Sequence, residues 1–223
     1  GSPLLTDDMW QKNVATAIAF GIPHLSCYAL TVEEKTPLHK QIVQLKKEDV
    51  DNEKQARQFL LLMQWLKASG YEHYEVSNFA KPGWRSRHNS SYWRGEKYLG
   101  IGPSAHSFTG EGRQWNVANN GQYIAALKNG LVPKEEELLT EEQKLNEYIM
   151  ISLRTMEGMD LEVVARLWGK NKKERIQQQI IPYINSALVK LKDNHLQLTD
   201  EGMLRADGIA ADLFSPLSPE AET

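Results

Sequence analysis

Three side chains that can bind a metal or a tetrapyrrole lie within five positions of one another: His88, Asn89 and Tyr92. An imidazole or a phenolate can ligate haem iron, and the same trio can equally form a hydrogen-bonded turn. The residue types alone favour the turn. The pattern therefore marks a candidate haem ligand and leaves both alternatives open.

The segment around this trio combines positive charge with aromatic rings. Residues 81–100 carry a net charge of +4, from Lys81, Arg85, Arg87, Arg94 and Lys97 against Glu96. Arginine forks and aromatic faces together bind flat anionic ligands such as nucleotides or porphyrin carboxylates. A solvated loop would carry the same charges but seldom so many aromatic residues, so we predict a binding function for this segment.

A loop of small residues follows, from Gly100 and Gly102 to His106. Glycines at this spacing let the backbone approach a ligand, and close packing of two backbone segments would use the same residues. The other histidines show no pair at zinc-ligand spacing. Cys27 is the single cysteine, which excludes an internal disulfide and a cysteine-ligated cluster built from this chain alone.

Composition sets the broad class. The chain has 223 residues, a formal charge of −3 and 41% hydrophobic residues, which is typical of a soluble globular protein. No apolar run approaches the roughly 20 residues of a membrane span, and the N-terminus has no signal-like core. We therefore expect a cytoplasmic protein without a transmembrane segment.

The first half predicts the elements that must position these residues. Helical spacing begins after Thr6, and a buried strand is expected over residues 24–31. A second helix is expected from about residue 49 or 51 to Ser69, followed by one strand over residues 71–79. Strand, helix, strand is the order of a parallel sheet or barrel. Residues 80–112 show no period, and a short helix ends at Gly130.

The second half predicts a mostly helical module. Pro133 and the acidic run at residues 135–137 indicate a linker, so we place a domain boundary between residues 133 and 134. Thr140 opens a helix with a capping box, and Asp160 caps another. Two helical stretches flank Pro182, and a strand over residues 195–199 and a last helix to about residue 213 follow. Residues 215–223 are expected to be a disordered tail.

These motifs together resemble the oxygen-independent coproporphyrinogen oxidase-like radical-SAM family, and most closely its haem-chaperone branch. The resemblance rests on residues 23–31 (PHLSCYALT), 70–80 (GYEHYEVSNFA), 87–93 (RHNSSYW) and 98–107 (YLGIGPSAHS), and it covers about residues 1–214. It implies an α/β fold: the C-terminal part of a partial (β/α)6 barrel over residues 1–133, then a winged-helix-like domain over residues 134–214. The chain would begin after the fifth barrel strand.

The resemblance also implies cofactors and site residues. S-adenosylmethionine and a [4Fe–4S] cluster belong to the longer parent protein, whose cluster-binding cysteines would lie upstream, so this chain alone is expected to be inactive. The family's HNxxY haem signature matches residues 88–92. It implies His88 as the iron ligand, with Asn89 and Tyr92 beside it and Arg85, Arg87 and Arg94 near the propionates.

Family position further implies a border of the S-adenosylmethionine pocket at Ala29, His106, Gly100 and Gly102. Residues 32–37 (VEEKTP) depart from the Glu-Pro-Gly-Thr-Pro usual in the family, which leaves that loop's geometry open. The leading hypothesis is a haem chaperone that delivers haem to a haem-accepting protein. The alternative is a coproporphyrinogen III oxidase that decarboxylates two propionates to vinyl groups.

A third hypothesis is a nucleic-acid-binding winged helix. Residues 200–223 carry one arginine against six acids, a net charge of −5, which repels phosphates. We therefore expect no nucleic-acid partner.

Overall fold

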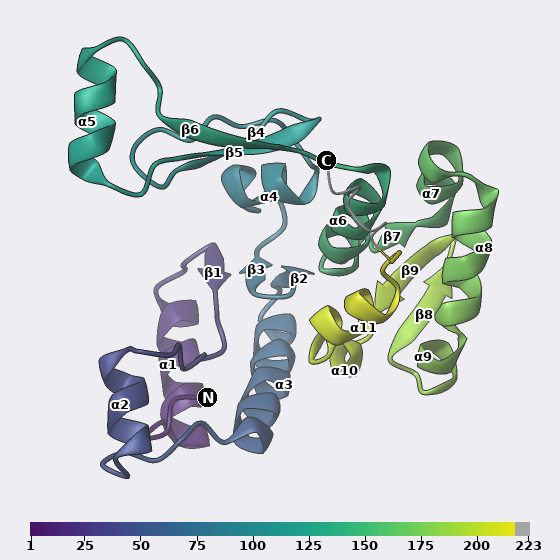
Figure 1. Cartoon of the computed structure of the whole chain (residues 1–223). Helices are drawn as coiled ribbons and strands as arrows, with labels where there is room; N and C mark the ends of the chain where they lie inside the picture. The colour runs from purple at the N-terminus through teal and green to yellow at the C-terminus, as the bar shows by residue number, and fades with distance from the viewer. Residues whose placement is uncertain (217–223) are drawn as a thin grey trace.

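The computed structural model describes residues 1–216, and the predicted tail beyond Pro216 lies outside the described residues. The described chain forms a mixed α/β fold with three small antiparallel sheets, each of three strands (Figure 1). Short strands of this kind are stabilised by the helices that cover them rather than by their own ladders.

The N-terminal elements form the first sheet and the helices beside it. They are α1 (Asp7–Ala19), β1 (His24–Ser26), α2 (Pro37–Val43), α3 (Asn52–Ala68), β2 (Glu72–Glu75) and β3 (Asn78–Ala80). The predicted helices over α1 and α3 are confirmed, and α2 is additional. Helices α1 and α3 pack against each other, and Trp10 of α1 donates its indole N–H to the carbonyl of Gln58 at 3.1 Å.

The expected parallel pairing is wrong for these strands. The strand order is β1-β3-β2, and β3 runs antiparallel to both neighbours. The predicted single strand over residues 71–79 is a hairpin, because Val76 and Ser77 bond elsewhere: the Val76 N–H to the Arg154 carbonyl, and the Ser77 N–H to the Glu75 carboxylate. The strand expected over residues 24–31 ends at Ser26 and is not fully buried.

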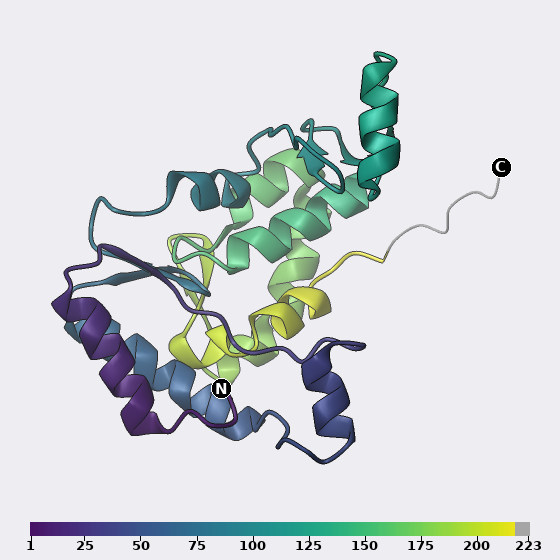
Figure 2. The ribbon, with the colours of Figure 1, turned by 90° about the vertical axis from the view of Figure 1, so that its left-hand side faces the viewer.

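The second sheet forms from the segment that shows no period. It contains β4 (His106–Phe108), β5 (Gly112–Asn116) and β6 (Lys134–Leu138), with α4 (Arg87–Trp93) before it and α5 (Asn120–Lys128) inside it. The helix expected before Gly130 is confirmed as α5. The predicted acidic linker is instead β6, which pairs with β5 along its whole length. Helix α5 projects from the rest of the fold (Figure 2).

The C-terminal part packs helices on the third sheet. Its elements are α6 (Glu141–Leu153), β7 (Met159–Asp160), α7 (Leu161–Trp168), α8 (Lys170–Gln179), α9 (Ile181–Asn185), β8 (Val189–Lys192), β9 (His195–Leu198), α10 (Asp200–Met203) and α11 (Ala206–Asp212). The two helical stretches predicted around Pro182 are α8 and α9, and Pro182 lies in the first turn of α9. The expected last helix is two helices, and β8 completes an unpredicted hairpin with β9.

One core connects the N-terminal and C-terminal parts. Buried residues of α3 and the first sheet (Leu62, Leu66, Phe79) join a cluster with those of α6 to α11 (Leu145, Ile149, Leu161, Ile176, Leu196, Ile209). Ser215, predicted to begin the tail, is buried, and its N–H donates to Asn146 at 2.7 Å. No helix among residues 1–216 is long and apolar enough to cross a membrane.

The capping box at the start of α6 gives a direct test of what stabilises this helix. The Thr140 hydroxyl accepts from the Gln143 N–H, and the Gln143 side chain accepts from the Thr140 N–H. We expect Thr140→Ala to lower the free energy of unfolding by about 1 kcal/mol, because the Gln143 N–H loses its side-chain acceptor. Urea denaturation measures the change. Thr31→Ala is the control, since the exposed Thr31 hydroxyl has no hydrogen bond within residues 1–216.

Candidate functional site

Helix α4 carries the His-Asn-x-x-Tyr residues, so a helix forms where the residue types alone favoured a turn. The Ser86 hydroxyl caps the helix by accepting from the Asn89 N–H at 3.2 Å. His88 and Tyr92 are one turn apart and both are exposed. The His88 Nε2 lies 3.4 Å from the Tyr92 hydroxyl, and the two rings meet edge to face with centroids 5.1 Å apart. The imidazole is therefore accessible from solvent.

A row of aromatic rings extends from this pair toward the second sheet. The Tyr92 and Tyr98 ring centroids are 4.9 Å apart, and those of Tyr98 and Phe108 are 6.3 Å apart. Backbone hydrogen bonds between Tyr98 and Phe108 fix this row to β4. These edge-to-face and tilted contacts form an aromatic surface beside His88, against which a flat ring system can pack.

The three predicted arginines differ in their availability. Arg87 is exposed and has no ion pair within residues 1–216. Arg94 pairs with Glu96 at 2.7 Å, with both side chains largely in solvent. Arg85 is held by two carboxylates, Glu72 at 3.1 Å and Glu157 at 2.7 Å. Surface pairs such as that of Arg94 are weak, whereas the two-partner contact of Arg85 restrains its guanidinium.

Arg85 and Arg94 line a cavity of about 360 Å³ together with Ser90 and Trp93. Ser90 and Trp93 lie two and five residues after His88, which turns them by roughly half a helical rotation from the exposed imidazole. His88, Tyr92 and Arg87 do not line this cavity. The structure therefore divides the predicted site residues between two sides of α4.

Asn89 points inward and connects α4 to the first sheet. The Asn89 side-chain amide donates to the Asn78 Oδ1 at 3.3 Å, and the Ser26 hydroxyl donates to the same oxygen at 2.7 Å. The Asn78 amide in turn donates to the buried carboxylate of Glu75. Asn89 thus contributes to the position of the helix, whereas His88 and Tyr92 form its exposed face.

Glu75 and Arg154 form an ion pair at the junction of the N-terminal and C-terminal parts. Glu75 is 1% exposed, and its carboxylate lies 3.1 Å from the Arg154 guanidinium. The same guanidinium binds Asp207 of α11 at 2.7 Å and lies 5.7 Å from the centre of the Trp93 ring. Sequence reasoning missed Glu75, Asn78 and Arg154, although polar Glu75 and Asn78 between the large apolar side chains of the YEVSNF segment were a usable signal.

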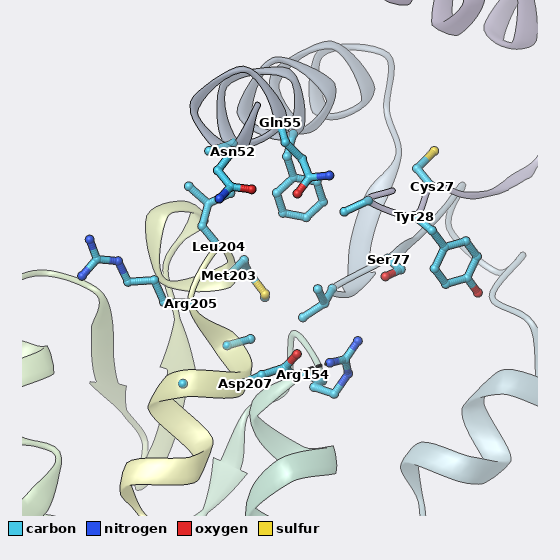
Figure 3. Close-up of a pocket in the computed structure, with 16 residues that line it drawn as sticks. Cys27, Tyr28, Asn52, Gln55, Ser77, Arg154, Met203, Leu204, Arg205 and Asp207 are labelled. Atoms are coloured by element: carbon cyan, nitrogen blue, oxygen red, sulfur yellow. Dashed lines mark hydrogen bonds and ion pairs between the residues drawn. The ribbon is translucent and has the colours of Figure 1, made fainter. Parts of the chain in front are cut away.

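A cavity of about 510 Å³ opens beside Arg154, and Ala29 is among the residues that line it. Asn52 and Gln55 project toward it from α3, and Arg154 and Asp207 face them from the C-terminal side (Figure 3). His106 lines a different cavity, of about 300 Å³, on the second sheet. The structure therefore does not bring Ala29 and His106 into one cavity.

The two loop glycines are explained by packing and backbone conformation. A Cβ on Gly100 would lie 2.1 Å from the carbonyl oxygen of His106, so only glycine lets these two backbone segments approach. Gly102 has a φ of +107°, and its carbonyl accepts from the Asn116 amide at 2.9 Å. The sequence left two explanations for these glycines open: approach of a ligand, or close packing of two backbone segments. The structure contains the close packing.

Cys27 lines the cavity of about 510 Å³ and is partly buried. Burial raises the pKa of the thiol to about 11, because the thiolate loses solvation there. No group of three or more His, Cys, Asp or Glu side chains within residues 1–216 is arranged to hold a metal ion. A cluster that needs several cysteine ligands does not fit the donors of this chain.

Comparison with known proteins defines the class. Residues 139–205 match the family described as the HemN C-terminal domain. The fold is similar to a solved structure titled "Coproporphyrinogen III oxidase (HemN) from Escherichia coli is a Radical SAM enzyme", with a TM-score of 0.70 and 17% identity over 96% of this chain and 53% of that one. The chain therefore shares the mixed α/β fold of that HemN structure.

The curated relatives define the branch. The chain is 32% identical to the heme chaperone HemW of Mycobacterium tuberculosis over 96% of its own length and 53% of the relative. It is 28% identical to the Bacillus subtilis heme chaperone HemW over 92% of its own length and 54% of that relative. A Danio rerio protein named radical S-adenosyl methionine domain-containing protein 1 is 29% identical over 90% and 48%. These matches confirm the resemblance to the coproporphyrinogen oxidase-like radical-SAM family and its haem-chaperone branch. The chain spans about half the length of these relatives.

The Glu75–Arg154 pair predicts a large loss of stability when it is broken. We expect Arg154→Met to lower the free energy of unfolding by about 3–5 kcal/mol, because it leaves a buried carboxylate without its charge partner. Urea denaturation of both proteins measures the difference. Arg113→Met is the control: Arg113 pairs with Glu147 at 2.7 Å but is 47% exposed, so we expect a change below about 1 kcal/mol. Equal losses in the two variants would contradict the assignment.

The raised pKa of Cys27 predicts both its reactivity and a pH effect. Native protein should react with iodoacetamide at pH 8 far more slowly than urea-unfolded protein, because the thiolate is the reactive form. Since the folded pKa of about 11 exceeds the unfolded value, the folded state holds its proton more tightly. The contribution of Cys27 to stability should be complete below the unfolded pKa and decline as the pH rises toward 11. Equal labelling rates would disprove the shift, and Cys27→Ser controls for other targets.

Proposed function

We propose that this chain provides the haem-binding surface of a haem chaperone, with His88 as the iron ligand. The observation that carries the proposal is the exposed imidazole of His88 on α4, next to Tyr92 and a row of aromatic rings. The names of the most similar curated relatives support it. Haem is the cargo of such a protein, to be handed on to a haem-accepting partner.

The donors on the outer side of α4 fit haem. An imidazole ligates the iron, and Tyr98 offers a face on which a macrocycle can stack. Arg87 is free within residues 1–216 to bind a propionate. Arg94 lines the cavity of about 360 Å³ on the other side of α4, so it contributes only if its exposed pair with Glu96 opens and its long side chain reaches round the helix. Arg85 contributes only if it exchanges Glu72 or Glu157 for a propionate.

The longer protein of which such chains form half would supply the S-adenosylmethionine and [4Fe–4S] chemistry. Ala29, Gly100, Gly102 and His106 remain our proposed border of the S-adenosylmethionine side. Ala29 lines the cavity of about 510 Å³ and His106 lies on the second sheet, so they would approach the cofactor from separate directions. The cluster ligands would come from the longer protein, because this chain has the single cysteine Cys27.

We propose two structural units within the chain: the end of a radical-SAM barrel, followed by a winged-helix-like C-terminal domain. The hairpin β8–β9 and the helices α6 to α8 support the second unit. Strand β6 pairs with β5, so residues 134–138 belong with the sheet of the first unit. A cytoplasmic location stays a proposal.

The ligand assignment predicts a specific loss on substitution. We expect His88→Ala to weaken haem binding by more than the roughly 10–100-fold lost when only a residue supporting a ligand is removed. Titration of haem into the chain, followed by the Soret band, measures affinity and ligation together. His195→Ala is the control, because His195 lies on β9 in the C-terminal sheet. An unchanged Soret band in the His88 variant would rule out this ligand.

The coproporphyrinogen oxidase alternative is supported by the fold alone, because the similarity to the HemN structure has 17% sequence identity. It predicts turnover of coproporphyrinogen by the full-length protein once the cluster is reconstituted. The haem-chaperone proposal predicts tight haem binding without that turnover. Product analysis by chromatography therefore separates the two functions.

A further inference from the structure

Helix α4 is too short to hold its position by itself. It has seven residues, fewer than an isolated helix needs to be stable in water. The direction of the His88 imidazole is therefore set by whatever fixes the inner side of the helix. Two contacts do so: the Asn89 amide bonds to Asn78, and the Trp93 ring lies 5.7 Å from the Arg154 guanidinium.

The two contacts lie one helical turn apart. Asn89 and Trp93 follow His88 and Tyr92 by one residue each, so the fixed face is turned by about 100° from the exposed face. Two points on one face prevent the helix from rotating about its own axis. Any rotation that did occur would change the direction of His88 and Tyr92 together.

Both contacts lead to the same buried group. Asn78 donates to the Glu75 carboxylate, and Arg154 binds that carboxylate at 3.1 Å. Arg154 also binds Asp207 of α11 at 2.7 Å. One guanidinium thus connects the hairpin of the first sheet, the helix that carries His88, and a C-terminal helix.

We propose that Arg154 is a positioning residue for the His88 ligand, and that Asp207 links haem retention to the C-terminal helices. The proposal rests on the proposed haem function, which it extends from the ligand to its control. The guanidinium is suited to this role because its planar fork presents several N–H groups: it binds two carboxylates and lies within cation–π range of the Trp93 ring. A displacement of α11 would pull on Arg154 and so loosen α4.

The test uses variants that preserve the charge beside Glu75. Arg154→Lys retains a cation there, but its compact ammonium lacks the planar fork whose separate N–H groups reach Glu75 and Asp207 while the guanidinium lies near the Trp93 ring. Asp207→Asn removes the α11 contact at a residue that is 78% exposed, so folding is not at risk. Glu162→Gln is the control: it breaks the similarly exposed Lys173–Glu162 pair, 2.7 Å long, which contacts no residue of α4.

We expect Arg154→Lys to weaken haem binding by roughly tenfold, the lower end of effects seen when a supporting residue is lost. Its electron paramagnetic resonance spectrum should show a mixture of iron ligation states, whereas Glu162→Gln should match the unmodified chain. Asp207→Asn should also weaken haem retention, which would be measured as faster haem release. Unchanged affinity and spectrum in both Arg154→Lys and Asp207→Asn would overturn the proposal.

A second background separates positioning from a general structural effect. In His88→Gly, exogenous imidazole supplies the iron ligand and is not held by α4. Arg154→Lys should then have no further effect on haem affinity. A persisting tenfold loss in that background would also overturn the proposal. If His88→Gly without imidazole binds haem as well as the unmodified chain, the proposed function itself fails, and this outcome is distinct from the other two.

Discussion

The buried carboxylate of Glu75 is the constraint around which this molecule is organised. A carboxylate that is 1% exposed requires both a charge partner and hydrogen-bond donors, since its desolvation is otherwise costly. Arg154, Asn78 and the Ser77 N–H meet that requirement. They come from the first sheet and from the end of α6, so satisfying one charge fixes the relation between the N-terminal and C-terminal parts.

This arrangement explains how the exposed side chain of His88 can be held firmly. His88 must be open to solvent if a tetrapyrrole is to reach it, so little of its own surface can be used for packing. Its neighbours one position along, Asn89 and Trp93, make the contacts instead. The HNxxY pattern thus combines an outward pair, His88 and Tyr92, with an inward residue that fixes them.

The elements with strong local signals were predicted correctly. Capped amphipathic helices such as α1, α3 and α6 form where their periodicity and N-caps indicated, because those signals act within a few residues. Several short elements were not predicted as such. Helix α4 lies in the segment that shows no period, β6 lies in the predicted linker, and β2 and β3 lie in one predicted strand. Each depends on partners far away in the chain, as when the Val76 N–H bonds to the Arg154 carbonyl.

The sequence by itself determined the composition class, the long helices and the family pattern with His88 at its centre, because these depend on residue identity and local spacing. Only the tertiary structure decided which residues act together. It divided the predicted arginines between two sides of α4, separated Ala29 from His106, and revealed Glu75 and Arg154. The physical reason is that burial and ion pairing depend on which side chains meet in space. Glu75 and Arg154 are 79 positions apart in the chain, so their contact cannot be read from local spacing.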